Sequence, residues 1–383
     1  MLRTPNALHQ RIYLDHAATT PLSEAARQAM TPWLNAGNAS SLYQEGRQAK
    51  EAIDSAREAV SEALGCLFAE VIFTSGGTEA ANLAIIGLAL GNEDPARNRV
   101  LLGAAEHHCV LHTADVLRRL GYSVELVGVD REARLDMADL GRKLGPDVLL
   151  ASVMHANNEL GSINPIAEIA DLVHGCGARL YVDAVQTFRR PDAIPLKWSV
   201  DDLRADLVSV SAHKVNGPKG TGALYVRAGT KIKALVGGGG QEREVRGGTE
   251  NVAAIAGFGA AVRQQPASID PEWCERLLTR LEGLGAVRTV VHGPFLSSHV
   301  HVRFPGIDAS TLLIALDRVG ISASSGAACS SGSIEPSHVL LACGYSHGEA
   351  REGIRLTMGA GTELCQLDEA AERIDGVLRR FRG

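Results

Sequence analysis

The sequence has few aromatic residues, no long apolar run and no strong charge of either sign. Phe, Trp and Tyr make up only 4% of its 383 residues. A membrane-spanning helix needs a run of about 18 or more apolar residues, and the sequence contains none. The 38 Lys and Arg nearly balance the 44 Asp and Glu, so the net charge is −6 and no basic footprint for nucleic acid is present. We therefore expect a protein that contacts neither membrane nor nucleic acid directly.

Paired cysteines and an export signal are also missing. The seven cysteines never occur as CxxC pairs, which argues against a disulfide framework and against a cysteine zinc site. The first twenty residues lack the apolar core of a secretory signal. These features predict a cytoplasmic protein with reduced thiols.

Short apolar runs alternate with amphipathic stretches over the first two thirds of the chain. Helical patterns cover residues 111–120 and 166–176, and this alternation predicts an α/β domain around a mostly parallel sheet. Beyond about residue 253 the pattern changes to a strand at 299–304 and helices at 310–319 and 368–380, which indicates a smaller α+β domain. The predicted buried strands are 71–73, 100–102, 124–127, 148–153, 180–182, 207–210 and 223–226.

A glycine-rich turn follows the first of these strands. Ser75, Gly76, Gly77 and Thr78 lead into an amphipathic helix, and free N–H groups at a helix N-terminus suit a phosphate. Taken alone, the turn favours an ordinary helix start capped by Thr78. The run GPKGTG at 217–222 lacks the Gly-Lys-Ser/Thr ending of a nucleotide-triphosphate loop.

Two further strands end in polar side chains. Asp183 follows one strand, where a carboxylate could pair with a protonated ring nitrogen or cap a helix. Lys214 follows another, after Ser211 and His213, where a partly desolvated lysine suits Schiff-base chemistry and an isolated surface lysine is the alternative. A phosphate cradle, a ring-nitrogen partner and a Schiff-base lysine together are what pyridoxal 5′-phosphate requires of a protein.

The order and spacing of these motifs resemble the cysteine desulfurases of the NifS/IscS type, which are class V aminotransferases of pyridoxal-phosphate fold type I. The resemblance implies a large cofactor-binding domain over 16–255 and a small domain from 1–15 and 256–383. The similar segments, spread over nearly the whole chain, are YLDHAATTP (13–21), GNASS (37–41), FTSGGTEAANLAI (73–85), AEHHCV (105–110), HANNELG (155–161), VDAVQT (182–187), SAHKVNGPKGTGALYVR (211–227), GGGQEREVRGGTEN (238–251), SSGAACSSGSIEPSHVL (324–340) and IRLTMG (354–359).

This resemblance implies a role for each matching residue. Lys214 forms the Schiff base, Asp183 partners the pyridine nitrogen and Gln186 bonds the ring hydroxyl. His107 stacks on the ring, and Asn158 and Arg355 bind the substrate carboxylate. The implied phosphate ligands are Gly77, Thr78, Ser211, His213 and, from the neighbouring subunit of a homodimer, Thr249.

Cys329 is the implied nucleophile toward the substrate sulfur. Its thiolate would take that sulfur from L-cysteine as a persulfide, leaving L-alanine, and would pass it to an acceptor protein. Cys329 lies among Ser, Gly and Ala residues, and 26 residues separate it from Arg355. These two features predict a mobile segment over about 330–337 that carries the sulfur outward. A buried structural thiol is the alternative.

The remaining expectations concern metal, function and departures from the family. His107, His108 and His112 lack a spaced partner motif, so we expect no metal. Desulfuration of L-cysteine for iron–sulfur cluster assembly, or for another sulfur-modification pathway, is the favoured function. Another fold-type-I enzyme, such as a selenocysteine lyase or an aminotransferase, is the first alternative, and a non-catalytic sulfur-transfer scaffold is the second. The residues that depart from the usual family pattern are His16, Ala39, Tyr43 and Ala212.

Overall fold

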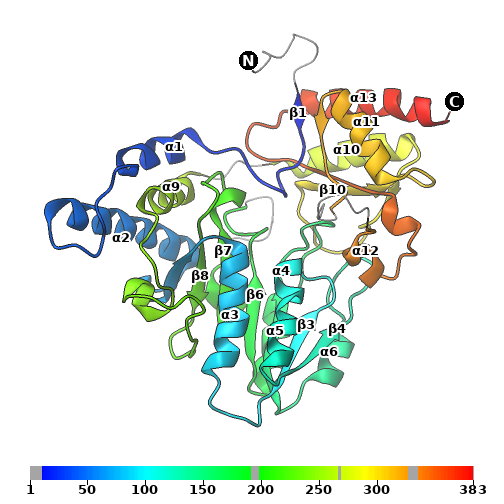
Figure 1. Cartoon of the computed structure of the whole chain (residues 1–383). Coiled ribbons are helices and arrows are strands. Elements are labelled where there is room, and N and C mark those ends of the chain that lie inside the picture. The colour runs from blue at the N-terminus through cyan, green and yellow to red at the C-terminus, as the bar shows by residue number, and fades with distance from the viewer. Residues whose placement is uncertain (1–10, 191–197, 266–268, 327–334, 383) are drawn as a thin grey trace.

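A seven-stranded sheet forms the centre of the larger part of the molecule (Figure 1). The computed structural model describes residues 11–190, 198–265, 269–326 and 335–382. β8 runs antiparallel to both its neighbours and the other pairs are parallel, which confirms the predicted mostly parallel sheet. In spatial order the strands are β2 (Val71–Thr74), β8 (Gly222–Val226), β7 (Leu207–Ser211), β6 (Arg179–Asp183), β5 (Val148–Met154), β3 (Arg99–Gly103) and β4 (Ser123–Val127).

Helices cover both faces of this sheet. Successive residues of β6 point to opposite faces, so Tyr181 and Val182 belong to two different apolar cores. This double burial explains why the strands appear in the sequence as continuous apolar runs instead of alternating ones. The helices of this part are α1 (Glu24–Met30), α2 (Gln44–Leu64), α3 (Gly77–Gly91), α4 (His108–Leu111), α5 (Thr113–Arg119), α6 (Met137–Lys143), α7 (Ile166–Gly175), α8 (Val200–Leu203) and α9 (Val252–Arg263).

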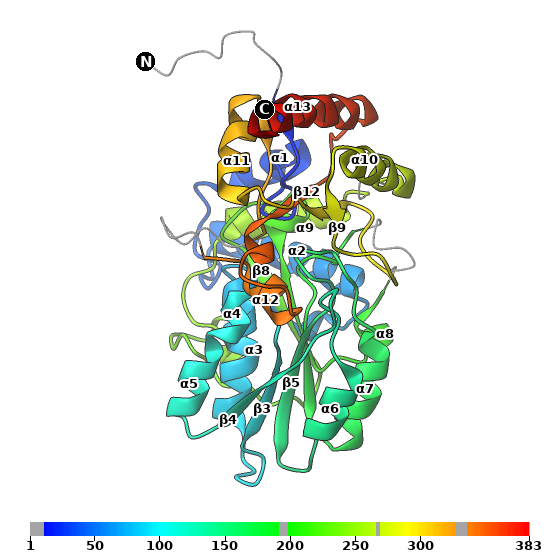
Figure 2. The ribbon, with the colours of Figure 1, turned by 90° about the vertical axis from the view of Figure 1, so that its right-hand side faces the viewer.

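A separate core lies among the helices gathered at one end of the molecule (Figures 1 and 2). It includes Ile12 and Leu14 from the start of the described chain together with residues beyond 268. The expected domain boundary at residue 255 falls inside α9, which packs against α1 and α2. No helix within the described ranges is both long and apolar enough to cross a lipid bilayer.

The predicted strand and helices of this second region are present. β10 (His299–Arg303) pairs with β9 (Val287–Arg288) and β12 (Gly353–Thr357), and β1 (Ile12–Tyr13) pairs with β11 (Ile321–Ser322). The final helix begins earlier than predicted, because apolar Leu364 and Leu367 already pack on this core. The helices are α10 (Pro271–Gly283), α11 (Ala309–Arg318), α12 (His338–Ala342) and α13 (Leu364–Arg382).

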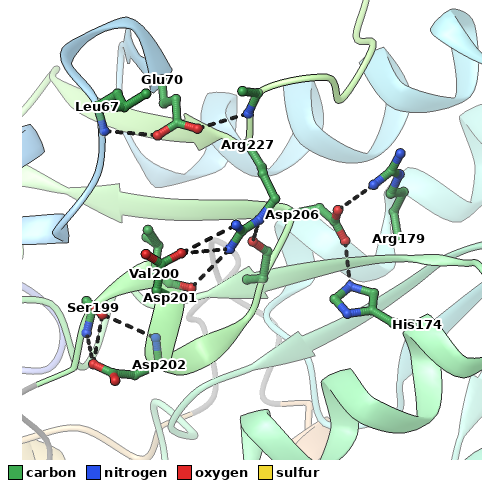
Figure 3. Close-up of polar contacts among 12 residues, drawn as sticks. Leu67, Glu70, His174, Arg179, Ser199, Val200, Asp201, Asp202, Asp206 and Arg227 are labelled. Carbon is green, nitrogen blue, oxygen red and sulfur yellow. Dashed lines mark hydrogen bonds and ion pairs between the residues drawn. The ribbon is translucent and has the colours of Figure 1, made fainter.

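A buried carboxylate joins the elements at the edge of the sheet where β6 and β7 begin (Figure 3). Asp206 accepts hydrogen bonds from the Leu180 N–H at 2.9 Å and from Arg179 Nη1 at 2.7 Å. Its other contact is His174 Nε2 on α7, also at 2.9 Å. Because Asp206 is only 2% exposed, these partners compensate for its lost hydration and fix α7 against the strands.

We predict that Asp206→Ala lowers the free energy of unfolding by about 2–4 kcal/mol, because it leaves buried donors without a partner. Urea denaturation measures the change. Asp201→Ala is the matched control, since the Asp201 carboxylate beside Arg227 is 76% exposed and exposed pairs contribute about 0–1 kcal/mol. Equal stability of the two variants would contradict the prediction.

Candidate functional site

A cavity of about 460 Å³ opens at the edge of the sheet where the parallel strands β5, β6 and β7 end. This is the edge at which open α/β sheets bind ligands. The cavity walls bring together side chains that are far apart in the sequence. The predicted residues that line it are Gly77, Thr78, His107, Asn158, Asp183, Gln186, Ser211, His213, Lys214 and Arg355.

Two predicted residues are not among these. Thr249 is exposed on the surface and does not line the cavity of its own chain. Cys329 lies outside the described residues, as does most of the segment expected to be mobile. Ser337, the last residue of that segment, is buried and caps the N-terminus of α12.

Lys214 lies in a short 3-10 turn, Ala212–Lys214, directly after β7. Its Nζ donates to the carbonyl oxygens of Ala17 and Ala18, the latter at 2.9 Å. Burial, and then the charge of Arg355, lower its pKa from 10.5 to about 7. The amine of Lys214 is therefore substantially unprotonated at neutral pH, as a Schiff-base lysine must be.

Asp183 ends β6 within the cavity wall and is 9% exposed. Its Oδ1 accepts from the Val185 N–H at 2.9 Å, and burial raises its pKa. A carboxylate held in so little water is stabilised by a cation, and a protonated pyridine nitrogen is such a cation.

Glycines shape the neighbouring lobe at the N-terminus of α3. A Cβ on Gly77 would lie 2.9 Å from Val185 Cγ2, and a Cβ on Gly222 would lie 2.8 Å from the Cα of Gly76. A larger residue at either position would collide with these neighbours at the start of α3. Thr78, Ser211 and His213 line the same lobe, so it has the form of a phosphate cradle.

Unpartnered polar atoms test whether pyridoxal phosphate fits here. Ser211 Oγ and Gln186 Oε1 are buried in the cavity wall without a hydrogen-bond partner. Buried polar atoms without partners are costly, and they mark positions where a ligand supplies the missing bond. Ser211 lies beside the phosphate lobe and Gln186 beside Asp183, so the residues present fit the cofactor.

His107 precedes α4 and caps it, with Nδ1 accepting from the Cys109 N–H at 3.1 Å. Burial, followed by the charge of Lys214, lowers its pKa to about 4. The imidazole is therefore neutral at pH 7 and can stack on an aromatic ring without adding charge to the cavity. Among the described residues, no group of three or more His, Cys, Asp and Glu side chains has the arrangement of a metal site.

Arg355 projects from β12 toward the cavity and is only 4% exposed. Nη1 donates to the Asn158 carbonyl oxygen and Nη2 to Asp15 Oδ1, both at 2.7 Å. Nε is buried and has no partner. The guanidinium is thus held in place by two acceptors at the wall of the cavity, where a charged N–H group can meet a carboxylate.

Sequence reasoning missed two of these contacts. Asp15 lies within the motif YLDHAATTP, yet no local signal shows that it pairs with a residue 340 positions away. The resemblance implies that Asn158 binds substrate, whereas the contact seen is its main-chain oxygen on Arg355. Ala212 is the first residue of the turn that carries Lys214. A Cβ built on Gly217 would lie only 2.9 Å from the Ala212 Cβ, so glycine at position 217 leaves room for this alanine.

This fold and this cavity define a pyridoxal-phosphate site in a fold-type-I protein. The Aminotransferase class-V family matches residues 12–368. Cysteine desulfurase IscS of Dictyoglomus turgidum is 40% identical over 98% of this chain and 96% of its own length. Putative cysteine desulfurase IscS 1 of Bacillus subtilis is 39% identical over 97% of this chain and 100% of its own.

Similar solved structures indicate the same family as these relatives. A NifS-like protein aligns with a TM-score of 0.89 at 31% identity, covering 97% of this chain and 100% of that one. SspA in complex with cysteine aligns with a TM-score of 0.81 at 32% identity, covering 91% and 99%. The chain belongs to the class V aminotransferases, within the group of NifS/IscS-type cysteine desulfurases, and its cofactor is pyridoxal 5′-phosphate.

The lowered pKa of Lys214 predicts how cofactor loading depends on pH. Only the neutral amine attacks the aldehyde of pyridoxal phosphate, so loading of cofactor-free protein should accelerate between about pH 6 and about pH 8 and then level off. The appearance of the yellow chromophore measures the rate. A rate that keeps rising toward the ordinary lysine pKa of 10.5 would contradict the assigned environment of Lys214.

Proposed function

We propose that the protein desulfurates L-cysteine to L-alanine and retains the sulfur as a persulfide on Cys329. The observation that carries the proposal is the cavity in which Lys214, Asp183 and Arg355 converge. The family supports the reaction, and the similar solved structure in complex with cysteine supports the substrate.

Arg355 and Asn158 orient the amino acid in this proposal. The Arg355 guanidinium lines the cavity and binds the substrate carboxylate, while Asp15 and the Asn158 carbonyl hold its plane. A guanidinium already fixed by two acceptors loses little freedom when substrate arrives. The substrate carbon chain is thereby held near Lys214.

Proton transfer at Cα is the task of Lys214. When bound, pyridoxal phosphate supplies the electron sink that stabilises the carbon after its proton leaves. Lys214 removes and returns that proton, since its depressed pKa of about 7 places the amine near the solution pH. Asp183 keeps the ring nitrogen protonated, and the neutral His107 ring covers the cofactor face.

Sulfur leaves by nucleophilic attack. The Cys329 thiolate forms a bond to the substrate sulfur as the carbon–sulfur bond breaks, and the electron pair of that bond stays with the carbon chain. Protonation of the chain completes L-alanine. The persulfide then passes its outer sulfur to an acceptor protein that serves iron–sulfur cluster assembly or another sulfur-modification pathway.

A homodimer completes the site in this proposal. Thr249 is exposed and does not line the cavity of its own chain, as expected of a residue that serves a neighbouring subunit. Large apolar side chains are exposed in the segment between α1 and α2, with Leu34 at 68%, Leu42 at 90% and Tyr43 at 53%. Large apolar side chains exposed to this degree support a second copy of this chain as the partner.

We expect the wild-type protein to release alanine and sulfide from L-cysteine in the presence of a reductant, and Lys214→Ala to release neither. Cys329→Ala should retain the yellow cofactor yet release no sulfur. Cys343→Ala is the matched control, because burial raises the pKa of the Cys343 thiol to about 12 and makes it a poor nucleophile. Normal sulfur release by Cys329→Ala would show that another group is the nucleophile.

Asp183→Asn should keep cofactor binding but slow Cα proton removal on the order of 100-fold or more, because an amide cannot keep the ring nitrogen protonated. Exchange of the Cα hydrogen with deuterated solvent measures this step directly. Asp201→Asn controls for loss of a carboxylate and should exchange at the wild-type rate, because Asp201 lies beside Arg227 (Figure 3) and does not line the cavity. Equal exchange rates in the two variants would reject the role of Asp183.

A further inference from the structure

Glu159 is a buried carboxyl group that the reaction outlined above does not use. It follows β5 directly after Asn158 and is 1% exposed. Its Oε2 accepts a hydrogen bond from Ser337 Oγ at 2.5 Å. Ser337 in turn caps α12, because its Oγ accepts from the Leu340 N–H at 3.1 Å. Glu159 therefore holds the start of α12 through Ser337. Ser337 lies three residues beyond the segment 327–334, which the structure does not describe.

The same carboxyl group lies against the residue at the other end of that segment. Gly326 has φ +80°, and a Cβ there would lie 2.7 Å from Glu159 Cγ and 2.9 Å from its Oε2. Only glycine allows the backbone to approach Glu159 so closely and to adopt this left-handed conformation. Gly326 and Ser337, on opposite sides of Cys329 in the sequence, thus share one partner.

Residues near Gly326 and Glu159 in the sequence also contact Arg355. Ser324 pairs with Arg355 through two main-chain hydrogen bonds, Ser324 N to Arg355 O at 3.1 Å and Arg355 N to Ser324 O at 2.6 Å. The Arg355 side chain bonds the carbonyl oxygen of Asn158, the neighbour of Glu159. The charge of Arg355 also reaches Glu159, where it opposes the rise in pKa to about 7 that burial causes.

A second attachment of α12 limits what the loss of Glu159 would do. His338 Nε2 lies 2.9 Å from the Glu106 carbonyl oxygen, and the His338 ring centroid is 4.1 Å from that of His108. Figures 1 and 2 both show α12 beside α4. With these contacts intact, removal of the Glu159 carboxyl group should free Gly326 and Ser337 from their shared partner without releasing α12.

We propose that Glu159 is a positioning residue for sulfur transfer: it holds Gly326 and Ser337, which lie on either side of Cys329 in the sequence, in a fixed place relative to Arg355. This role rests on the proposed function, since it matters only if Cys329 attacks substrate sulfur. Glu159 itself touches neither substrate nor cofactor. It acts through Gly326 and Ser337, the described residues between which the segment carrying Cys329 leaves and rejoins the fold.

The test compares Glu159→Ala with Glu159→Gln in the cofactor-loaded enzyme. One readout is the rate at which the cofactor absorption changes on mixing with L-cysteine, which reports substrate binding. The other is the rate of persulfide formation on Cys329, followed by rapid quenching and mass spectrometry. A misplacement of about 1 Å costs on the order of 100-fold in rate, so Glu159→Ala should slow the second readout by that order and leave the first near the wild-type value.

Glu159→Gln should restore most of the rate of persulfide formation, because its amide oxygen still accepts from Ser337 and its shape is the same. A merely structural role would lower both readouts together, along with the melting temperature. Glycine variants probe the other contact independently. Gly326→Ala should reproduce the defect, whereas Gly306→Ala should not, since Gly306 has the matching φ of +79° and open space around it.

Ser337 decides the question if Glu159→Ala fails to fold. Ser337→Ala should slow persulfide formation and Ser337→Thr, which keeps the hydroxyl group, should restore it. Persulfide formation at the wild-type rate in Glu159→Ala, or in Ser337→Ala and Gly326→Ala, overturns the positioning role. Absence of any persulfide on Cys329 in the wild-type enzyme overturns the proposed function instead, so the two failures are distinct.

Discussion

Removing charged groups from water at one edge of a sheet is the constraint on which the rest of this structure depends. Arg355 and Asp183 are buried and Lys214 is half-buried around the same cavity. Arg355 is tolerated there because Asp15 and a carbonyl oxygen compensate for its hydration, and its charge then helps to lower the pKa of Lys214. The reactive amine of Lys214 thus depends first on burial and then on how the arginine is held.

The two ends of the same strands serve different purposes. Where β6 and β7 begin, Asp206 has a partner for each of its oxygens and the contacts fasten strands to α7. Where they end, Ser211 and neighbouring groups keep unpartnered atoms. Satisfied polar groups stabilise the fold, whereas unsatisfied ones have binding capacity for a ligand. The stability of one edge allows the other to remain incompletely bonded.

The sequence was most informative where the signal was local. The strands ending at Asp183 and Ser211 could be predicted because each is a short apolar run buried on both faces, and the phosphate turn because glycines precede an amphipathic helix. Asp15 and Glu159 could not be assigned a role in this way. Their partners, Arg355 and Ser337, lie 340 and 178 residues away, and no periodicity connects residues at such separations.

By itself the sequence determined the order of strands and helices and the chemical groups available, because backbone propensity and side-chain chemistry are properties of short segments. Only the tertiary structure decided which of those groups are buried together. Lys214 becomes a weak base through burial and through Arg355, and Glu159 meets both Gly326 and Ser337 because separate elements pack side by side. Desolvation and proximity depend on the whole fold, so they appear only when the chain is assembled.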